Sequence, residues 1–521
     1  MAIKLFIFWV LGLFFGGGGN AQPSIQWQKC YGGSEYDYAS SLQHTNDNGY
    51  IVAGFVESHD GDVSSNAGTF DFWIVKLDQF GSIQWEKTFG GGDDDRAQNI
   101  KQTNDGGYIV AGYTASNDGD VSGNHGGIYD AWVLKLSSTG ALEWQKCFGG
   151  SGWDEANAVE QTPDGGYIVA GTGSSNDGDI SGNHGSSDFW VLKLTENGNI
   201  EWQKSLGGSK SDRATSIKQT SDGDYIIVGE TQSIDGDVSG NNGDYDIWVV
   251  KLSPSGDLEW QNTLGGANLD SGGDIVETSD GFVVCGHVGS QNTGDVLENH
   301  GFFDYWIVKL DKTGQLIWQK TFGGTNADYA RSIIQTSDGM LLIVGEAKSN
   351  NGDVEGNNGI QIVWVLKLDQ SGSLIWKKPL GGTQGEGCWS VQQTSDEGYI
   401  LAGYSWSNDG DVSGNHGQAD FWIVKLAPES SLTSTPQSLN LQIYPNPATS
   451  TISLDIPNSF QTQETQTLSI QITDLLGQVL SHQTISADQS IDVSALPNGL
   501  YLLSAIMPDG TVFSGKFSKL D

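Results

Sequence analysis

The stretch from Asp130 to Gly150, DAWVLKLSSTGALEWQKCFGG, decides the fold because near copies of it recur along the chain. Each of its two tryptophans belongs to a series of seven, and both series advance by 58 or 59 residues. A fixed period of this length is typical of repeat proteins, in which neighbouring units cover each other's apolar faces. The first series is Trp73, Trp132, Trp190, Trp248, Trp306, Trp364 and Trp422, and the second is Trp27, Trp85, Trp144, Trp202, Trp260, Trp318 and Trp376.

The composition limits the class of protein and its partners. The 521 residues include 64 acidic and 25 basic side chains, which leave a net charge of −39. A field of this sign repels phosphate backbones and anionic membranes, so we expect no nucleic acid partner. Hydrophobic residues make up 37% of the chain and glycine contributes 73 residues, which favours a packed β protein over a disordered chain.

Each repeat contains four predicted strands separated by turn signals. In the second unit the turns Asn104-Asp105-Gly106 and Ser138-Thr139-Gly140 supply residues that tolerate positive φ. The third strand is apolar on both faces, so neighbouring sheets must cover both of its sides. The predicted strands of this unit span residues 97–103, 107–113, 130–136 and 141–148.

The last unit supplies only three strands, whereas a lone strand at Ile25–Tyr31 precedes the first unit. Pairing of this lone strand with the last unit would complete a fourth strand and remove an exposed sheet edge. We therefore predict an all-β fold in which residues 22–426 form a seven-bladed β-propeller closed by the N-terminal strand. The alternative fold is an open β-solenoid.

One lysine recurs inside the apolar third strand, where an unpaired ammonium group would be costly. Up-and-down topology places it beside an aspartate in the turn between the first two strands. We predict structural ion pairs or snorkelling lysines at these positions. The lysines are Lys76, Lys135, Lys193, Lys251, Lys309, Lys367 and Lys425, and the aspartates are Asp47, Asp105, Asp164, Asp222, Asp280, Asp338 and Asp396.

The N-terminal segment and the cysteines indicate an exported protein without disulfides. Residues 1–21 begin with Lys4, continue through an apolar run and end at Ala21, the pattern of a secretory signal peptide. The apolar run is shorter than the roughly 20 residues that span a bilayer, and we expect no transmembrane segment after signal cleavage. The four cysteines occupy unrelated repeat positions, which predicts four free thiols.

A second domain follows the repeats. Residues 427–439 have the composition of a linker, and the short strands of residues 440–521 predict a small β-sandwich. This domain resembles the type A C-terminal sorting domain of the type IX secretion system of Bacteroidetes. The resemblance rests on Tyr444-Pro445-Asn446-Pro447, Asp474-Leu475-Leu476-Gly477-Gln478, Leu496-Pro497-Asn498-Gly499-Leu500-Tyr501 and Lys516-Phe517-Ser518-Lys519.

The resemblance implies a destination and a partner. Chains of this kind pass through the periplasm and cross the outer membrane with the type IX secretion machinery, and they are released or attached to the cell surface. The repeats are similar to those of uncharacterised secreted β-propeller cargo of the same system, which names no activity.

Acidic and aromatic residues gather in the loops of one propeller face. The loop between the second and third strands repeats DGDVSGN, and the corner between units repeats a GGSxxxD pattern, so we expect an acidic rim. Trp153, Trp389 and Trp406 depart from the repeat, and exposed aromatic rings on a polar rim suit stacking against sugars. The alternative is that these rings pack within the blades. The corner carboxylates are Asp37, Asp95, Asp154, Asp212, Asp270, Asp328 and Glu386.

The DGDVSGN loop also predicts calcium binding. In the third unit Asp177, Asp179 and Ser181 alternate, Gly182 takes the sixth place and Asp188 the twelfth, a spacing that resembles EF-hand-like and dockerin-like calcium loops. The alternative is a loop held by Asx turns and backbone hydrogen bonds, without an ion. The equivalent strong candidates are Asp235, Asp237, Ser239 and Asp246 in the fourth unit and Asp409, Asp411, Ser413 and Asp420 in the seventh. The weaker candidates are Asp60, Asp62, Asp118 and Asp120, whereas Thr293, Leu297, Asn351 and Ile362 remove ligands from the fifth and sixth loops.

These features support three functional hypotheses. The first is a secreted or cell-surface binding propeller without enzymatic activity, whose ligand is a glycan, a polymer or a protein. The second is a carbohydrate-active enzyme, a hydrolase or lyase, that uses carboxylates of the acidic rim. The third is a purely structural spacer. Seven-fold repetition of the acidic residues argues against catalysis, because a catalytic pocket needs a departure from symmetry.

Overall fold

The computed structural model describes residues 22–429, 439–440, 442–455, 467–473, 479–486, 490–506 and 512–520. Two compact units divide between Glu429 and Ser430. The described residues form strands and loops and contain no helix, and therefore no helix long and apolar enough to cross a membrane. The predicted signal peptide and most of the predicted linker, residues 430–438, lie outside the described residues.

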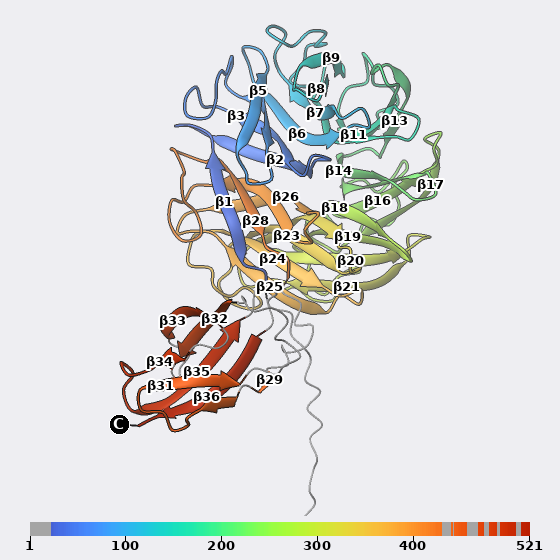
Figure 1. Ribbon diagram of the computed structural model, residues 1–521. Coiled ribbons are helices and arrows are strands. Elements are labelled where there is room, and N and C mark those ends of the chain that lie inside the picture. Colours follow the sequence, from blue (N-terminus) through green and yellow to red (C-terminus); the bar gives the residue numbers. More distant parts are fainter. Residues whose placement is uncertain are drawn as a thin grey trace, which may run out of the picture. The chain divides into compact units, whose positions relative to one another are not determined.

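Seven four-stranded antiparallel sheets make up residues 22–429 (Figure 1). The first strands are β2 (Asp37–His44), β6 (Asp95–Gln102), β10 (Asp154–Gln161), β14 (Asp212–Gln219), β18 (Asp270–Thr278), β22 (Asp328–Gln335) and β26 (Glu386–Gln393). The second strands are β3 (Tyr50–Val56), β7 (Tyr108–Thr114), β11 (Tyr167–Gly173), β15 (Tyr225–Thr231), β19 (Gly281–Val288), β23 (Leu341–Ala347) and β27 (Tyr399–Ser405).

The third and fourth strands complete each sheet. The third strands are β4 (Asp71–Leu77), β8 (Asp130–Leu136), β12 (Asp188–Leu194), β16 (Asp246–Leu252), β20 (Asp304–Asp311), β24 (Ile362–Leu368) and β28 (Asp420–Leu426). The fourth strands are β5 (Ile83–Phe89), β9 (Leu142–Phe148), β13 (Ile200–Leu206), β17 (Leu258–Leu264), β21 (Leu316–Phe322), β25 (Leu374–Leu380) and, for the last sheet, β1 (Ile25–Tyr31).

The N-terminal strand β1, which the sequence predicts to complete the last unit, pairs antiparallel with β28. In this register Cys30 lies opposite Trp422. Just beyond the pair, the amide of Ala427 donates a hydrogen bond to the Ser24 carbonyl at 2.9 Å. Two segments about 400 residues apart in the sequence are therefore joined in one sheet.

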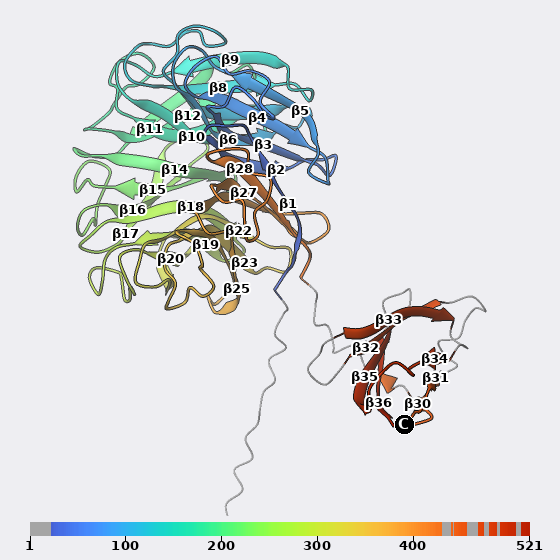
Figure 2. The same cartoon turned by 90° about the vertical axis from the view of Figure 1, so that its left-hand side faces the viewer.

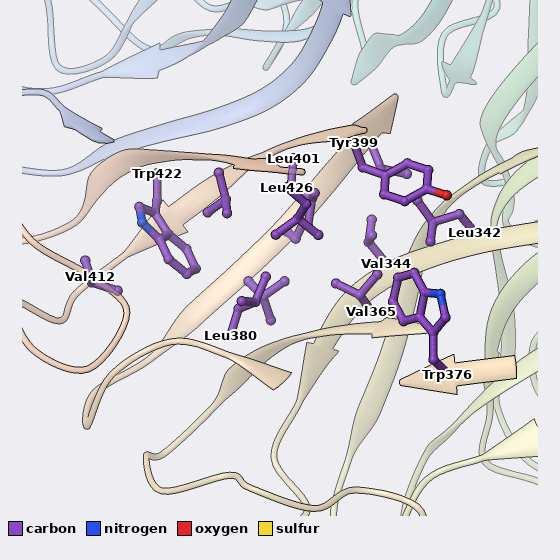
Figure 3. Packing of buried hydrophobic residues seen from close by; sticks show 14 of the residues in the cluster. Leu342, Val344, Val365, Trp376, Leu380, Tyr399, Leu401, Val412, Trp422 and Leu426 are labelled. Atoms are coloured by element: carbon purple, nitrogen blue, oxygen red, sulfur yellow. The ribbon is translucent and has the colours of Figure 1, made fainter. Parts of the chain in front are cut away.

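Neighbouring sheets pack face to face through apolar clusters. Figure 3 shows the cluster between the sixth and last sheets, where Trp376 and Val365 of one sheet face Leu401 and Trp422 of the other. The first and last sheets also pack together, because Trp73 and Phe421 place their ring centroids 4.6 Å apart. The sheets follow one another around the unit, and each first strand contacts the first strands of both neighbours (Figures 1 and 2).

The predicted lysine pairs are confirmed in all seven units. The lysine ammonium group lies 2.5–3.2 Å from a carboxylate oxygen of the turn aspartate, as in Lys193 with Asp164 and Lys425 with Asp396. The lysine side chains are buried, whereas their aspartate partners are about half exposed. Each ion pair therefore lies at the end of the sheet, with its carboxylate toward the solvent. The four cysteines are buried and free, as the sequence predicts.

Every first strand contains a β-bulge at its fourth residue. The register shifts between Ala39 and Ser41 in β2, and the same shift occurs at the equivalent place in the other six first strands. A bulge inserts one extra residue and changes the direction of a side chain. The fourth residues are Ser40, Gln98, Asn157, Thr215, Gly273, Arg331 and Trp389.

The C-terminal unit consists of two sheets around one core (Figure 2). Ile452, Ile470, Leu503 and Phe517 contribute to this core from both sheets. The motif at residues 474–478 lies outside the described residues. One sheet orders β29 (Leu439–Asn440), β36 (Val512–Lys519), β35 (Gly499–Ile506), β32 (Thr467–Thr473) and β33 (Val479–Ser486), and the other orders β30 (Gln442–Tyr444), β31 (Thr451–Asp455) and β34 (Ile491–Asp492).

Candidate functional site

The seven first strands surround a cavity of about 540 Å³, which we call the channel. Every first strand contributes to its lining, and the bulged fourth residues are among the lining side chains. These fourth residues have seven different identities, so the channel wall lacks the repetition of the sheets. Because a specific binding site needs a unique arrangement of groups, the channel is the candidate functional site of the repeats.

Four charged side chains in or beside the channel wall form an asymmetric group. The Lys218 ammonium lies 3.8 Å from the Glu160 carboxylate and 3.6 Å from the Asp274 carboxylate. Asp274 also accepts hydrogen bonds from the Ser216 hydroxyl at 2.7 Å and the Ser332 hydroxyl at 3.2 Å. Desolvation lowers the pKa of Lys218, but Asp274 and Glu160 outweigh it and raise the pKa above its ordinary value. Lys218 is therefore a fixed cation with its charge already compensated.

Lys101, the fourth member of this group, lacks such compensation. It lines the channel from β6 and makes no ion pair or hydrogen bond with a described residue. Desolvation lowers its pKa to about 8, and the positive charge of Lys218 contributes to the same effect, against the opposing charges of Glu160 and Asp274. The channel thus contains one amine without a partner in the described part of the chain.

We call the end of the channel at which the first strands begin the mouth. Aromatic rings lie along one side of it. Trp389 stacks on Tyr38 with centroids 6.2 Å apart and planes 15° apart. Tyr404 contacts Tyr38 at 4.9 Å and Trp406 at 6.2 Å. These four rings come from the last and first sheets, and Trp406 is 47% exposed. They form one half of a row of rings whose two halves are joined by Arg96 and Asp94.

The row continues along the first sheet to Arg96 of the second. Tyr38 contacts Phe55, and Phe55 contacts Phe70, with centroids 5.3 and 5.5 Å apart. The guanidinium of Arg96 lies 4.4 Å from the Phe70 centroid, and its Nε donates to Asp94 at 2.8 Å.

Tyr129 forms the far end of the row. Its hydroxyl donates to Asp94 at 2.9 Å, and its ring lies 5.1 Å from the 44% exposed Trp153. We call the whole row, Trp389, Trp406, Tyr404, Tyr38, Phe55, Phe70, Tyr129 and Trp153, the aromatic arc.

The three tryptophans singled out from the sequence therefore all lie at the mouth, and most of their partners were missed. Tyr38, Phe55 and Tyr404 stand at repeat positions that also hold non-aromatic residues. The overlooked signal is variation along the first strand: its third and sixth residues stay small or aliphatic, whereas its second and fourth residues change from unit to unit. Aligning the seven first strands would have located the channel.

The expected acidic rim is wrong for its corner carboxylates, which are interior. Asp37, Asp154 and the equivalent residues of the other first strands are fully buried. Asp154 accepts hydrogen bonds from the amides of Gly150 and Ser175 at 2.9 and 3.1 Å and from the Ser175 hydroxyl. The physical reason is that the turn between two sheets leaves backbone N–H groups without strand partners, and these carboxylates accept them.

A second buried aspartate lies at the same corners, as the first residue of most third strands. Asp188 accepts from the backbone amide of His184 at 3.0 Å and lies 2.7 Å from its Nδ1, while its other oxygen has no partner among the described residues. Burial raises the pKa of Asp188 to about 6, although the bonds from His184 oppose this effect. Burial likewise raises the pKa of Asp246 to about 7.

The predicted calcium ligands accept hydrogen bonds, the aspartates from the corner backbone and the serines from a side chain of the fourth strand. Asp177 accepts from the Ser151 amide at 2.8 Å, Asp179 from the Gly149 amide at 3.4 Å, and Ser181 from the Gln203 side chain at 2.6 Å. The bonds recur for Asp235, Asp237 and Ser239, for Asp409, Asp411 and Ser413, and for Asp60, Asp62, Asp118 and Asp120.

The twelfth-position residues Asp188, Asp246 and Asp420 instead face the residues four before them in sequence. No group of three or more acidic, histidine or cysteine side chains among the described residues is placed to hold a metal.

The loops without a full ligand set keep the same backbone bonds. Thr293 accepts from the Ala267 amide at 3.0 Å, and Asn351 accepts from the Thr325 amide at 2.9 Å. Gly178, which has a φ of 63°, is required by close approach, because a Cβ there would lie 2.1 Å from the Gly149 carbonyl oxygen. The shared residues thus have a role in the hydrogen-bonded corner, and calcium binding stays a prediction.

Comparison with known families assigns the C-terminal unit. Residues 442–517 match the family described as the Secretion system C-terminal sorting domain. This match covers β30 to β35 and most of β36, and it includes the first three motifs of the sequence. The protein is therefore secreted or held at the outer cell surface by type IX export.

The similarities to individual proteins either cover a small part of this chain or have a low TM-score. The regulatory protein FlaEY of Caulobacter vibrioides is 26% identical over 169 residues, which are 30% of this chain and 17% of that protein. The extracellular domain of a putative one-component system from B. thetaiotaomicron is 12% identical with a TM-score of 0.41, over 95% of this chain and 58% of its own.

A puromycin hydrolase mutant is 11% identical with a TM-score of 0.41, over 71% of this chain and 51% of its own. This chain thus spans less than two thirds of each of these proteins. None of the three similarities transfers an activity to it.

Proposed function

We propose that the seven sheets are the blades of one closed β-propeller, and that its channel mouth binds a glycan or surface polymer without chemical turnover. The aromatic arc is the observation that carries this proposal. Its rings run across four sheets, and Trp153 and Trp406 at its ends are 44% and 47% exposed. Aromatic faces of this kind stack on the C–H faces of sugar rings.

The channel beside the arc supplies the polar groups that such a ligand needs. Gln98, Asn157 and Ser40 line it together with the charged group around Lys218. Binding sites commonly combine apolar and aromatic surface with a few polar groups that fix the orientation of the ligand. Sugar hydroxyls match amide and hydroxyl side chains as hydrogen-bond partners, and secretion brings the mouth into contact with extracellular polymers.

The test is binding of the mature chain to a panel of soluble polysaccharides, with assays for both affinity and product release. We expect binding without new reducing ends, and a loss of at least about tenfold in affinity for the Trp153→Ala/Trp406→Ala double variant. The matched control is Phe80→Ala, since Phe80 is 67% exposed in the turn between β4 and β5, outside the arc. Unchanged affinity in the double variant would refute the proposal, and no binding at all would favour a structural spacer.

Glycan cleavage is the second candidate function, and Glu155 is the observation that favours it. Burial raises the pKa of Glu155, although the hydrogen bond from the Trp153 indole at 2.5 Å opposes this effect. A carboxyl with a raised pKa beside an exposed aromatic ring suits a general acid. In contrast, Glu160 and Asp274 are held by Lys218. Product release that disappears in Glu155→Gln would establish this function in place of binding alone.

A further inference from the structure

The chain places all of its arginines on the first strands. It contains three, Arg96 on β6, Arg213 on β14 and Arg331 on β22, and no other segment has one. Lys101 and Lys218 add two more cations to the same strands. Five of the 25 basic residues of the chain, including every arginine, thus lie on the strands that line one channel. Arginine is the side chain best suited to paired hydrogen bonds with carboxylate and sulfate oxygens.

Three of these five cations have partners within the protein. Arg96 pairs with Asp94 at 2.8 Å, and Arg331 pairs with Glu346 at 2.6 Å. Lys218 lies between Glu160 and Asp274. Their charges are balanced, so they fix the geometry of the mouth and the channel wall and leave little net attraction for a ligand.

The remaining two cations, Lys101 and Arg213, make no ion pair or hydrogen bond with a described residue. Arg213 is exposed at the second position of β14, where its charge acts on Glu155 and lowers the pKa of that carboxyl against the effect of burial. Lys101 lies in the channel wall, where an amine without a counterion is unfavourable. Two unpaired cations on strands of one channel provide charges for a ligand to neutralise.

We infer that the ligand is an acidic polysaccharide that extends from the mouth into the channel. Its sugar rings stack on the aromatic arc, and its carboxylate or sulfate groups pair with Arg213 near the mouth and with Lys101 deeper in the channel. This inference rests on the proposed function and specifies its ligand class. The overall negative charge does not prevent such binding, because the Debye length is about 8 Å at physiological ionic strength and exposed acids of the outer loops are screened. Partly buried channel charges are screened much less.

The experiment is isothermal titration of the mature full chain with three tetrasaccharides of galactose type: neutral, uronate and sulfate-bearing. We expect at least one acidic probe to bind about tenfold more tightly than the neutral probe. Arg213→Gln and Lys101→Met should each weaken the preferred acidic probe about fivefold to tenfold and leave the affinity for the neutral probe unchanged. The control Lys204→Met removes one positive charge from the outer strand β13 and should change neither affinity.

The outcomes separate this inference from the proposed function. A difference between the uronate and sulfate probes identifies the anionic group, and either preference supports the inference. Binding of the neutral probe with equal or higher affinity overturns the inference and leaves the proposed function intact. Unchanged affinity for the acidic probe in both variants also overturns it, and Arg213→Gln keeps this test valid because Arg213 is exposed and its replacement leaves the core unchanged. Failure of all three probes to bind overturns this inference, whereas the proposed function is contradicted only if the polysaccharide panel also shows no binding.

Discussion

The third strands and the first strands of the same sheets differ in what repeats. All seven third strands keep a buried tryptophan, a lysine and a closing leucine at the same places, as in Trp190, Lys193 and Leu194. The first strands keep only the residues that face neighbouring sheets or corners, and their channel residues differ from one another. One strand type therefore carries the packing common to all sheets, and the other carries the features by which they differ.

This difference teaches how function can be located in a repeat protein. A residue that recurs in every unit makes the same contact seven times, which serves stability and gives no unique site. A residue that changes from unit to unit is free to serve a ligand, provided that the fold brings it to one place. The bulge in each first strand does this by turning a variable residue into the channel wall.

The largest expected effect comes from removing a strand of the repeated framework. Deletion of Ile25–Tyr31 exposes the β28 edge and removes the buried Cys30 and Tyr31, so we expect a loss of about 5 kcal/mol in unfolding free energy. Denaturant unfolding of the deleted and intact chains measures it. Gln26→Ala, at an exposed site on the same strand, is the control and should change little. Equal stability of the deleted and intact chains would contradict the role of β1.

Calcium tests whether the repeated loops do more than hold the corners. If the third, fourth and seventh loops bind the ion, free calcium at about ten times Kd should stabilise the folded chain by about 1.4 kcal/mol per site. Calorimetry of the metal-stripped protein measures the heat, and the combined Asp179→Ala, Asp237→Ala and Asp411→Ala variant should lose it. Asp295→Ala in the fifth loop is the matched control. Absence of heat in the unmutated protein leaves only the hydrogen-bonded corner.

Carboxylates at the two ends of each sheet should make the stability depend on pH in opposite directions. Burial raises the pKa of Asp37, Asp71 and Asp304 to about 6, so the folded state binds protons more readily than the unfolded state. Stability from these corners is present below pH 4 and is lost as pH rises toward 7. Between pH 7.5 and 5 each of these three carboxyls should contribute about 1.4 kcal/mol, the equivalent of one pKa unit, so we expect a gain of about 4 kcal/mol in unfolding free energy.

The turn aspartates at the opposite end of each sheet should make the stability fall at acid pH. Partial burial raises the pKa of Asp47 and Asp105, but hydrogen bonds from their lysine and threonine partners lower it to about 2. Stability from these pairs is present above pH 4 and is lost as pH falls toward 2. Thermal unfolding at constant ionic strength should therefore show a maximum near pH 4–5. A steady decrease in stability from pH 7.5 to 5 would contradict the account of the corners.

A single ion pair should have a smaller effect. Asp396→Asn keeps the turn hydrogen bonds but removes the charge that faces the buried Lys425, so we expect a loss of about 2 kcal/mol. Adding Lys425→Met should restore part of the loss, because no buried ammonium then lacks a counterion. Thermal unfolding of the single and double variants measures both effects. If Asp396→Asn were as stable as the parent, the ion pair with Lys425 would contribute nothing to stability, and the expected loss would be contradicted.

The repeat period was sufficient to predict the strands, the pairing of β1 and the lysine pairs, because each depends on a pattern that occurs many times. The channel could not be predicted by the same means. Lys101 and Lys218 share a repeat position that carries no lysine in the other five units, and Glu160 and Asp274 each occur in one unit. Only the arrangement of the sheets brings these four residues together. The corner carboxylates were misplaced because an acidic pattern does not reveal that Asp154 accepts backbone hydrogen bonds in the interior.

The most direct test of the division between framework and site compares two tryptophans in one protein. Trp190→Ala removes a buried ring of the repeated third strand, and Trp389→Ala removes a ring of the channel. Thermal unfolding and polysaccharide titration of both variants, below their unfolding temperatures, is the measurement. We predict that Trp190→Ala loses about 3–5 kcal/mol of stability with unchanged affinity, whereas Trp389→Ala loses at least about tenfold in affinity with a small change in stability. Equal affinity in Trp389→Ala and the parent, or lost affinity in folded Trp190→Ala, would contradict the account.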